Sequence, residues 1–137
     1  MVCGLLALPL GCGGDALTPE ERVRWTVDEM ATAAELGDVS LLAEFVSDGY
    51  QDARGQGKRE LRALVAYHVM RHPDRHVLAH VHNVVMRDDG RAEVVVTAGT
   101  AGSGAGGLRG DVYELDLDFV NEDGDWRLAW AQWRPAL

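Results

Sequence analysis

Cysteine is almost absent from this sequence. The 137-residue chain contains only Cys3 and Cys12, and both lie in its opening segment. Residues 15–137 therefore have no disulfide framework. A single domain of this length buries about two thirds of its unfolded surface, so it needs neither disulfides nor a structural metal to fold.

Positive charge is also scarce. The chain has 13 lysines and arginines against 22 aspartates and glutamates, which gives a formal net charge of -9. Proteins that bind nucleic acids rely on lysine and arginine to displace counterions from phosphates. We therefore exclude nucleic acid as a partner.

The sequence lacks an apolar run that could span a membrane as a helix, which takes about 20 residues. Residues 1–10 are nearly all apolar or small, and this length is that of the apolar region of a secretory signal. The stretch ends in "LPLGC", which resembles the lipobox of bacterial lipoproteins. Gly11 would precede the cleavage point and Cys12 would carry the lipid, although Pro9 stands where that pattern prefers leucine.

This resemblance implies that residues 1–17 are a signal, lipid anchor and tether, and that residues 18–137 form the folded domain. The protein would then lie in the bacterial cell envelope, lipid-anchored to a membrane and facing the periplasm or the exterior. The alternative interpretations are an apolar terminus with an incidental cysteine, or a buried first strand.

Helices are expected in the first half of the domain. "TPEE" predicts a helix start, because Thr18 can cap a helix and Glu21 completes a capping box. Gly37 is expected to end this helix. Asp38 then caps a short second helix that reaches Val46, and "SDG" after it predicts a turn.

A short strand and a loop are expected at "YQDARGQG", followed by a third helix that starts near Lys58 and stops at Pro73. The pattern then alternates, as in strands. Strands are expected over residues 76–86, 92–98, 112–120 and 126–133. "RDDGR" and "NEDGD" predict tight turns, and the glycine-rich residues 99–110 predict a loop. In the last strand, Trp126, Leu128 and Trp130 should share one face. The order indicates an α+β domain, with helices packed on one face of a curved antiparallel sheet.

Three stretches carry a family resemblance: "ELGDVSLLAEFVSDGYQD", "KRELRALVAYHV" and "GDWRLAWAQWR". In this order they resemble the nuclear transport factor 2-like superfamily, which includes the SnoaL-like and ketosteroid-isomerase-like proteins. The resemblance implies a cystatin-like cone with a pocket between sheet and helices, and a homodimer formed through the sheet. The superfamily holds isomerases, cyclases and dehydratases as well as non-catalytic binding domains, so the fold alone does not decide the function.

The resemblance marks Asp52 and His68 as catalytic candidates. Asp52 stands where the isomerases carry the carboxylate that takes a proton beside a carbonyl group, and dehydratases of the superfamily pair a histidine with an aspartate. The tyrosine expected on the first helix is missing, which leaves Tyr50 and Tyr113 as substitutes. Alternatively, Asp52 binds local backbone in a turn and His68 is a core histidine bonded to a carbonyl. The candidates for lining the pocket are Tyr50, Asp52, Val65, His68, Tyr113, Leu115 and Trp130.

No metal or cofactor is expected. His76, His80 and His82 supply only part of a metal site, and they are expected on the outer face of the sheet. The glycine-rich residues 99–110 join two strands and lack the features of a phosphate-binding loop. Trp133, opposite in alternation to Trp130, is expected at a dimer contact.

Two functions remain. The first is an envelope-tethered, non-catalytic module that binds a small hydrophobic ligand or a protein and forms a homodimer. The alternative is a small isomerase, cyclase or dehydratase that acts on a hydrophobic carbonyl compound, with Asp52 as the base and His68 or Tyr113 as the acid.

Overall fold

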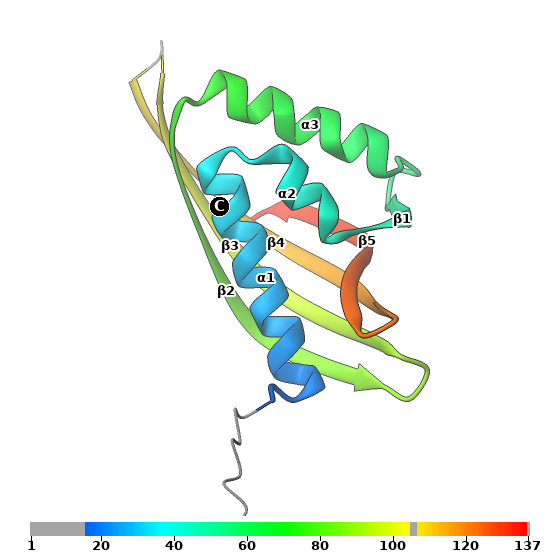
Figure 1. Ribbon diagram of the computed structural model, residues 1–137. Helices are drawn as coiled ribbons and strands as arrows, with labels where there is room; N and C mark the ends of the chain where they lie inside the picture. Colours follow the sequence, from blue (N-terminus) through cyan, green and yellow to red (C-terminus); the bar gives the residue numbers. More distant parts are fainter. Residues whose placement is uncertain (1–15, 105–106, 137) are drawn as a thin grey trace, which may run out of the picture.

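The described part of the chain forms one five-stranded sheet that carries three helices on one side (Figure 1). This computed structural model describes residues 16–104 and 107–136. The elements in chain order are α1 (Pro19–Leu36), α2 (Val39–Glu44), β1 (Val46–Asp52), α3 (Lys58–Arg71), β2 (Asp74–Arg87), β3 (Arg91–Gly104), β4 (Gly107–Glu122) and β5 (Asp125–Pro135). The strand order is β1-β5-β4-β3-β2, with β1 parallel to β5 and the other pairs antiparallel. The predicted α+β class is confirmed.

The helix ends follow the local signals. Thr18 Oγ1 accepts a hydrogen bond from the Glu21 amide at 3.2 Å, and Gly37 ends α1 in the left-handed conformation at φ 74°. Asp38 caps α2 through the Leu41 amide at 3.0 Å. Helix α2 ends earlier than predicted, because Val46 already belongs to β1. None of the described helices is long and apolar enough to cross a membrane.

The hydrophobic core lies between α1 and the concave face of the sheet. Val23 and Val27 of α1 are buried in one cluster with Val94 of β3 and Phe119 of β4. Phe119 is fully buried, so its truncation to alanine would cost about 3–5 kcal/mol. By contrast, α3 has no buried residue: Leu61 and Val65 pack against the core but stay only partly buried, which leaves space between α3 and the sheet.

The predicted turn at Ser47–Gly49 is wrong, since these residues lie inside β1. The pairing register shifts there, since Val46 pairs with Leu128 and Gln51 pairs with Trp130. Between these two pairs β1 contains more residues than β5, so β1 bulges. Ser47 Oγ accepts a hydrogen bond from the Gly49 amide at 3.3 Å. Residues typical of turns serve here to bulge a strand rather than to reverse the chain.

The glycine-rich loop predicted over residues 99–110 is also wrong. Strands β3 and β4 continue through this stretch until Gly104 pairs with Gly107. The backbone of Gly102 lies so close to β2 that a Cβ atom there would be 3.1 Å from the Asp74 carbonyl oxygen. Glycine in this part of the strand permits close approach of a neighbouring backbone.

The face predicted for Trp130 is wrong because β5 contains a bulge. Leu128 pairs with the buried Phe119, but the next pair along joins Trp130 to Asp118, whose side chain points to the opposite face. One extra residue therefore reverses the alternation. Beyond the bulge, Ala131 and Trp133 take the positions that face the core side.

Candidate functional site

A cleft of about 390 Å³ opens between α3 and the concave face of the sheet. This lies within the roughly 300–1,000 Å³ of small-molecule pockets. Its depth is apolar: α3 contributes Leu61, Val65 and Val69, and the sheet contributes Leu115 and Trp133. The cleft exists because the apolar stripe of α3 faces the sheet without being buried against it.

The rim of the cleft is polar and basic along one wall. This wall, which we call the histidine wall, consists of His68 and His72 from α3 and its C-terminal cap, and Arg75 and His76 from the start of β2. The rings of His68 and His72 stack, with centroids 6.2 Å apart and an interplanar angle of 11°. His72 is the C-cap of α3 and its backbone is no longer helical, as the following proline predicts. Its ring still lies beside that of His68.

Arg75 holds the histidine wall in place. Its Nε donates to the Ala34 carbonyl of α1 at 3.0 Å, and its Nη1 donates to the His72 carbonyl at 3.0 Å and the Val69 carbonyl at 3.5 Å. These carbonyls end α1 and α3, where helix dipoles leave negative charge. The guanidinium therefore ties two helices to β2, and a Cβ atom on Gly37 would collide with it.

Four of the predicted pocket residues line the cleft together: Val65, His68, Tyr113 and Leu115. Within the described part of the chain, the His68 ring has no hydrogen bond to a carbonyl, so the core-histidine interpretation does not describe its position. Its side chain is exposed towards the cleft.

The other three predicted pocket residues, Tyr50, Asp52 and Trp130, are not part of the lining. Asp52 is buried, and its Oδ1 accepts hydrogen bonds from the Arg54 amide at 2.8 Å and the Gln56 amide at 2.9 Å. These contacts are those of an aspartate that organises a turn. The geometry of Asp52 therefore matches the alternative prediction from the sequence, that this aspartate binds local backbone in a turn.

Tyr50 lies near Asp52 in the core. Burial, together with the negative charge of Asp52, raises the pKa of Tyr50 to about 12. Its hydroxyl is fully buried and has no hydrogen-bond partner among the described residues. A phenol with so high a pKa is a poor proton donor at neutral pH.

The sequence analysis missed three residues of the lining, namely His72, Arg75 and Asp111. The prediction that Trp133 lies at a dimer contact is wrong, because the bulge in β5 turns its side chain into the cleft. A signal for Arg75 was present, because it lies two positions before Val77 in the same inward alternation. His76 was expected beside His80 and His82, but it lines the cleft, and its Nδ1 lies 3.7 Å from Glu35 Oε1. The rings of His80 and His82 lie edge to face with centroids 4.7 Å apart.

Metal ligands do not converge in residues 16–104 and 107–136: no three histidine, cysteine, aspartate or glutamate side chains come together there.

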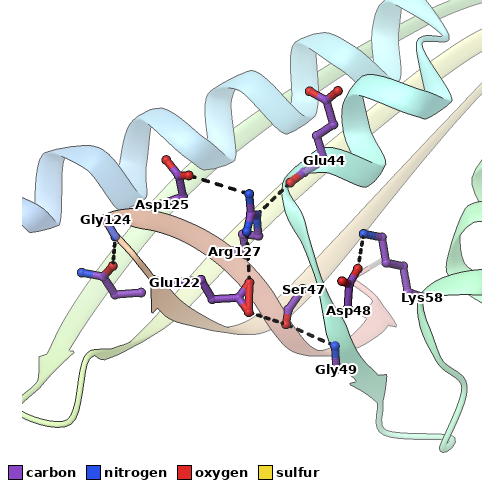
Figure 2. Close-up of polar contacts among 10 residues, drawn as sticks. Glu44, Ser47, Asp48, Gly49, Lys58, Glu122, Gly124, Asp125 and Arg127 are labelled. Atoms are coloured by element: carbon purple, nitrogen blue, oxygen red, sulfur yellow. Dashed lines mark hydrogen bonds and ion pairs between the residues drawn. The ribbon is translucent and has the colours of Figure 1, made fainter.

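A second hollow of about 400 Å³ lies beside the N-terminal half of α1 and the β4–β5 turn. Its central cation, Arg127, is engaged by neighbouring residues of the same chain. Arg127 donates to the Glu44 carbonyl at 3.2 Å and forms ion pairs with Glu122 at 3.6 Å and Asp125 at 3.7 Å (Figure 2). Ser47 Oγ donates to Glu122 Oε2 at 3.2 Å in the same network. Because these groups are engaged with each other, we take the cleft under α3 as the candidate site.

The fold and the cleft define a class of protein: a cone-shaped domain of the nuclear transport factor 2-like (NTF2-like) fold. Solved structures bear this out. A candidate dehydratase of the NTF2-like family from Streptomyces avermitilis has a TM-score of 0.74 and 19% identity over 86% of this chain and 97% of its own. A candidate scytalone dehydratase from Novosphingobium aromaticivorans also has a TM-score of 0.74, with 9% identity over 86% of this chain and 84% of its own.

A third similar structure is a candidate association domain of calcium/calmodulin-dependent protein kinase II from Xanthomonas campestris. It has a TM-score of 0.71 and 12% identity over 89% of this chain and 95% of its own. No family model matches the sequence, and no curated protein is detectably similar to it. At these identities the likeness shows the fold, and the function has to be argued from the cleft itself.

Proposed function

We propose that this protein is a non-catalytic module that binds a small hydrophobic molecule in the cleft under α3. The observation that carries the proposal is the position of Asp52. This carboxylate, which the family resemblance marks as a base, is absent from the lining, and one of its oxygens is held by two backbone amides. The cleft offers an apolar depth instead.

Binding can be tested with N-phenylnaphthylamine, a neutral apolar dye whose fluorescence rises when it leaves water. We expect saturable binding to the wild-type protein and loss of binding in Leu115→Trp, because the larger ring fills the cleft. Leu36→Trp is the matched control, since Leu36 is 69% exposed on α1 and lies outside the lining. Equal binding to both variants would contradict the proposal.

The second part of the proposal is a lipid anchor at Cys12 that holds the domain at the bacterial cell envelope. "LPLGC" supports it. The chain enters the described structure at the N-terminal end of α1, whereas Ala34 near the other end lines the cleft. Over 18 residues the helix is about 27 Å long, so the cleft would lie at the end of α1 remote from the anchor.

The anchor is tested by mass spectrometry of the full chain made in a Gram-negative host. We expect an acylated chain that begins at Cys12 in the membrane fraction, and a soluble, unmodified chain for Cys12→Ser. An intact, unmodified wild-type chain in the soluble fraction would overturn this part of the proposal.

The third part is a homodimer formed through the outer face of the sheet. Leu78 and Val95 are 77% and 39% exposed on strands β2 and β3, and such apolar surface supports an interface. Sedimentation analysis should show a dimer that Leu78→Asp dissociates. Leu36→Asp, at a position of α1 that is 69% exposed, should leave the dimer intact.

A second candidate function is catalysis by a dehydratase or isomerase, because His68 and Tyr113 line the same cleft. Either side chain can transfer a proton. Proton magnetic resonance in heavy water would detect exchange beside the carbonyl group of apolar ketones. Exchange that is lost in His68→Phe and Tyr113→Phe would favour the enzyme over the binding module.

A further inference from the structure

We infer that the ligand of this cleft carries an acidic group, which the histidine wall binds while the apolar body lies under α3. The inference rests on the proposed function and adds to it the chemical class of the ligand: an amphipathic monoanion such as an aromatic carboxylate. The argument begins with the distribution of charge around the lining.

The histidine wall presents hydrogen-bond donors. Every imidazole, neutral or charged, carries at least one N–H group. Both rings line the cleft, and among the described residues neither His68 nor His72 has a side-chain hydrogen bond. The free ring nitrogens are therefore available to a ligand at the rim.

Arg75 adds a fixed positive charge behind these rings. In the described part of the chain its guanidinium forms no ion pair with a carboxylate, and its hydrogen bonds go to main-chain carbonyls. A half-buried cation without a carboxylate favours negative charge nearby, because the surrounding protein screens charge less than water does.

Carboxylates are sparse around the cleft, although the whole chain is acidic. Asp111 of β4 is the one carboxylate among its described lining residues, and it lies on the wall formed by the sheet. Glu35 approaches His76, but its Oε1 also accepts a hydrogen bond from the Val77 amide at 3.1 Å. A cationic ligand would therefore meet one carboxylate and face the arginine and three imidazoles.

The matched dyes N-phenylnaphthylamine and anilinonaphthalene sulfonate test the inference, since they share an aromatic body and differ in the negative charge. We expect wild-type protein to bind the sulfonate at least about tenfold more tightly than the neutral dye, which is what one hydrogen bond to a charged group would supply. Naphthoic acid should displace the sulfonate better than its methyl ester does.

The variants His68→Phe and His72→Phe keep an aromatic ring and remove the N–H groups. The double variant should lose most of the preference for the sulfonate and keep its affinity for the neutral dye. His80→Phe is the control, because this exposed histidine lies outside the lining. Asp111→Asn should strengthen binding of the sulfonate severalfold by removing a repulsive charge.

The outcomes separate the two claims. If the neutral dye binds in the cleft and the sulfonate binds no better, the ligand class is wrong and the binding module stands. If neither dye responds to Leu115→Trp, the proposed function itself fails. A preference for the sulfonate that survives in the double variant would place its recognition elsewhere and overturn the inference.

Discussion

Two arginines occupy comparable places at the two hollows of this molecule. Arg75 and Arg127 each extend from a strand and donate to a carbonyl at the C-terminal end of a helix, Ala34 in α1 and Glu44 in α2. Arg127 is also paired with Glu122 and Asp125 (Figure 2). Arg75 has no carboxylate partner in the part of the chain that the structure describes.

The difference shows how similar building blocks serve different ends. Around Arg127, opposite charges satisfy each other and hold the α2–β1 junction against the β4–β5 turn. Around Arg75, main-chain carbonyls accept the hydrogen bonds of the guanidinium and leave its positive charge unneutralised. The neighbouring imidazoles face the cleft. The charge of Arg127 is therefore neutralised within the chain, whereas the charge of Arg75 is left to interact with a ligand.

Among substitutions that test the contrast between the two arginines, the largest expected effect is that of Arg75→Met. The loss of charged hydrogen bonds to the ends of α1 and α3 should lower the free energy of unfolding by about 2–3 kcal/mol in urea titrations. Arg71→Met is the control, because Arg71 is exposed and donates to Tyr67 within α3. If both variants were equally stable, Arg75 would not hold the two helices.

A smaller effect is expected for Gly37→Ala. Gly37 has φ 74°, and an added Cβ atom would collide with the Arg75 guanidinium. Backbone strain at residue 37 and displacement of the Arg75 side chain should together lower the free energy of unfolding by about 1–2 kcal/mol in the same titration. Because the cost includes displacement of Arg75, it should be smaller in the Arg75→Met background; strict additivity of the two substitutions would show that they do not interact.

Arg127→Met should cost less, about 1 kcal/mol, because partly exposed ion pairs contribute little. Its loss should also leave binding of N-phenylnaphthylamine unchanged, since Arg127 is remote from the cleft lining. A cost equal to that of Arg75→Met would abolish the contrast between the two regions.

The smallest effect at neutral pH is expected for Tyr50→Phe. Its buried hydroxyl has no partner among the described residues, so its removal should change the free energy of unfolding by no more than about 1 kcal/mol. The pKa of Tyr50 is raised from 10.0 to about 12 in the folded chain. The unfolded chain therefore ionises first, and wild-type stability should fall between these two pH values.

The measurement is a urea titration of both proteins from neutral to alkaline pH. Wild type should lose more stability than Tyr50→Phe as the pH rises through 10, because the variant lacks the group that ionises. Parallel curves for the two proteins would mean that Tyr50 has an ordinary pKa in the folded state.

Much of the fold could be predicted from the sequence. The caps at Thr18 and Asp38, the left-handed Gly37 and the turn glycines are local signals, and local backbone preferences decide such features. The alternation of β4 likewise placed Leu117 and Phe119 in the core. The strand ends near residues 99–110 could not be predicted in this way, since pairing with β2 keeps a glycine-rich stretch extended.

The candidate site was predictable in part. Val65, His68, Tyr113 and Leu115 follow from periodicity, because a helix face and a strand face repeat regularly. Trp130 and Trp133 could not be assigned correctly, because a bulge in β5 exchanges the faces that strict alternation gives them. Asp52 has the sequence position of a base, but its burial and its two amide partners are tertiary facts.

By itself the sequence determined where the helices begin, where α1 ends, two of the tight turns between strands, and the class of fold that these elements build. Those choices depend on caps, glycines and alternation over a few neighbouring residues. Only the tertiary structure decided which side chains meet across the cleft, because bulges in β1 and β5 and the reach of Arg75 depend on strands and helices far apart in the chain.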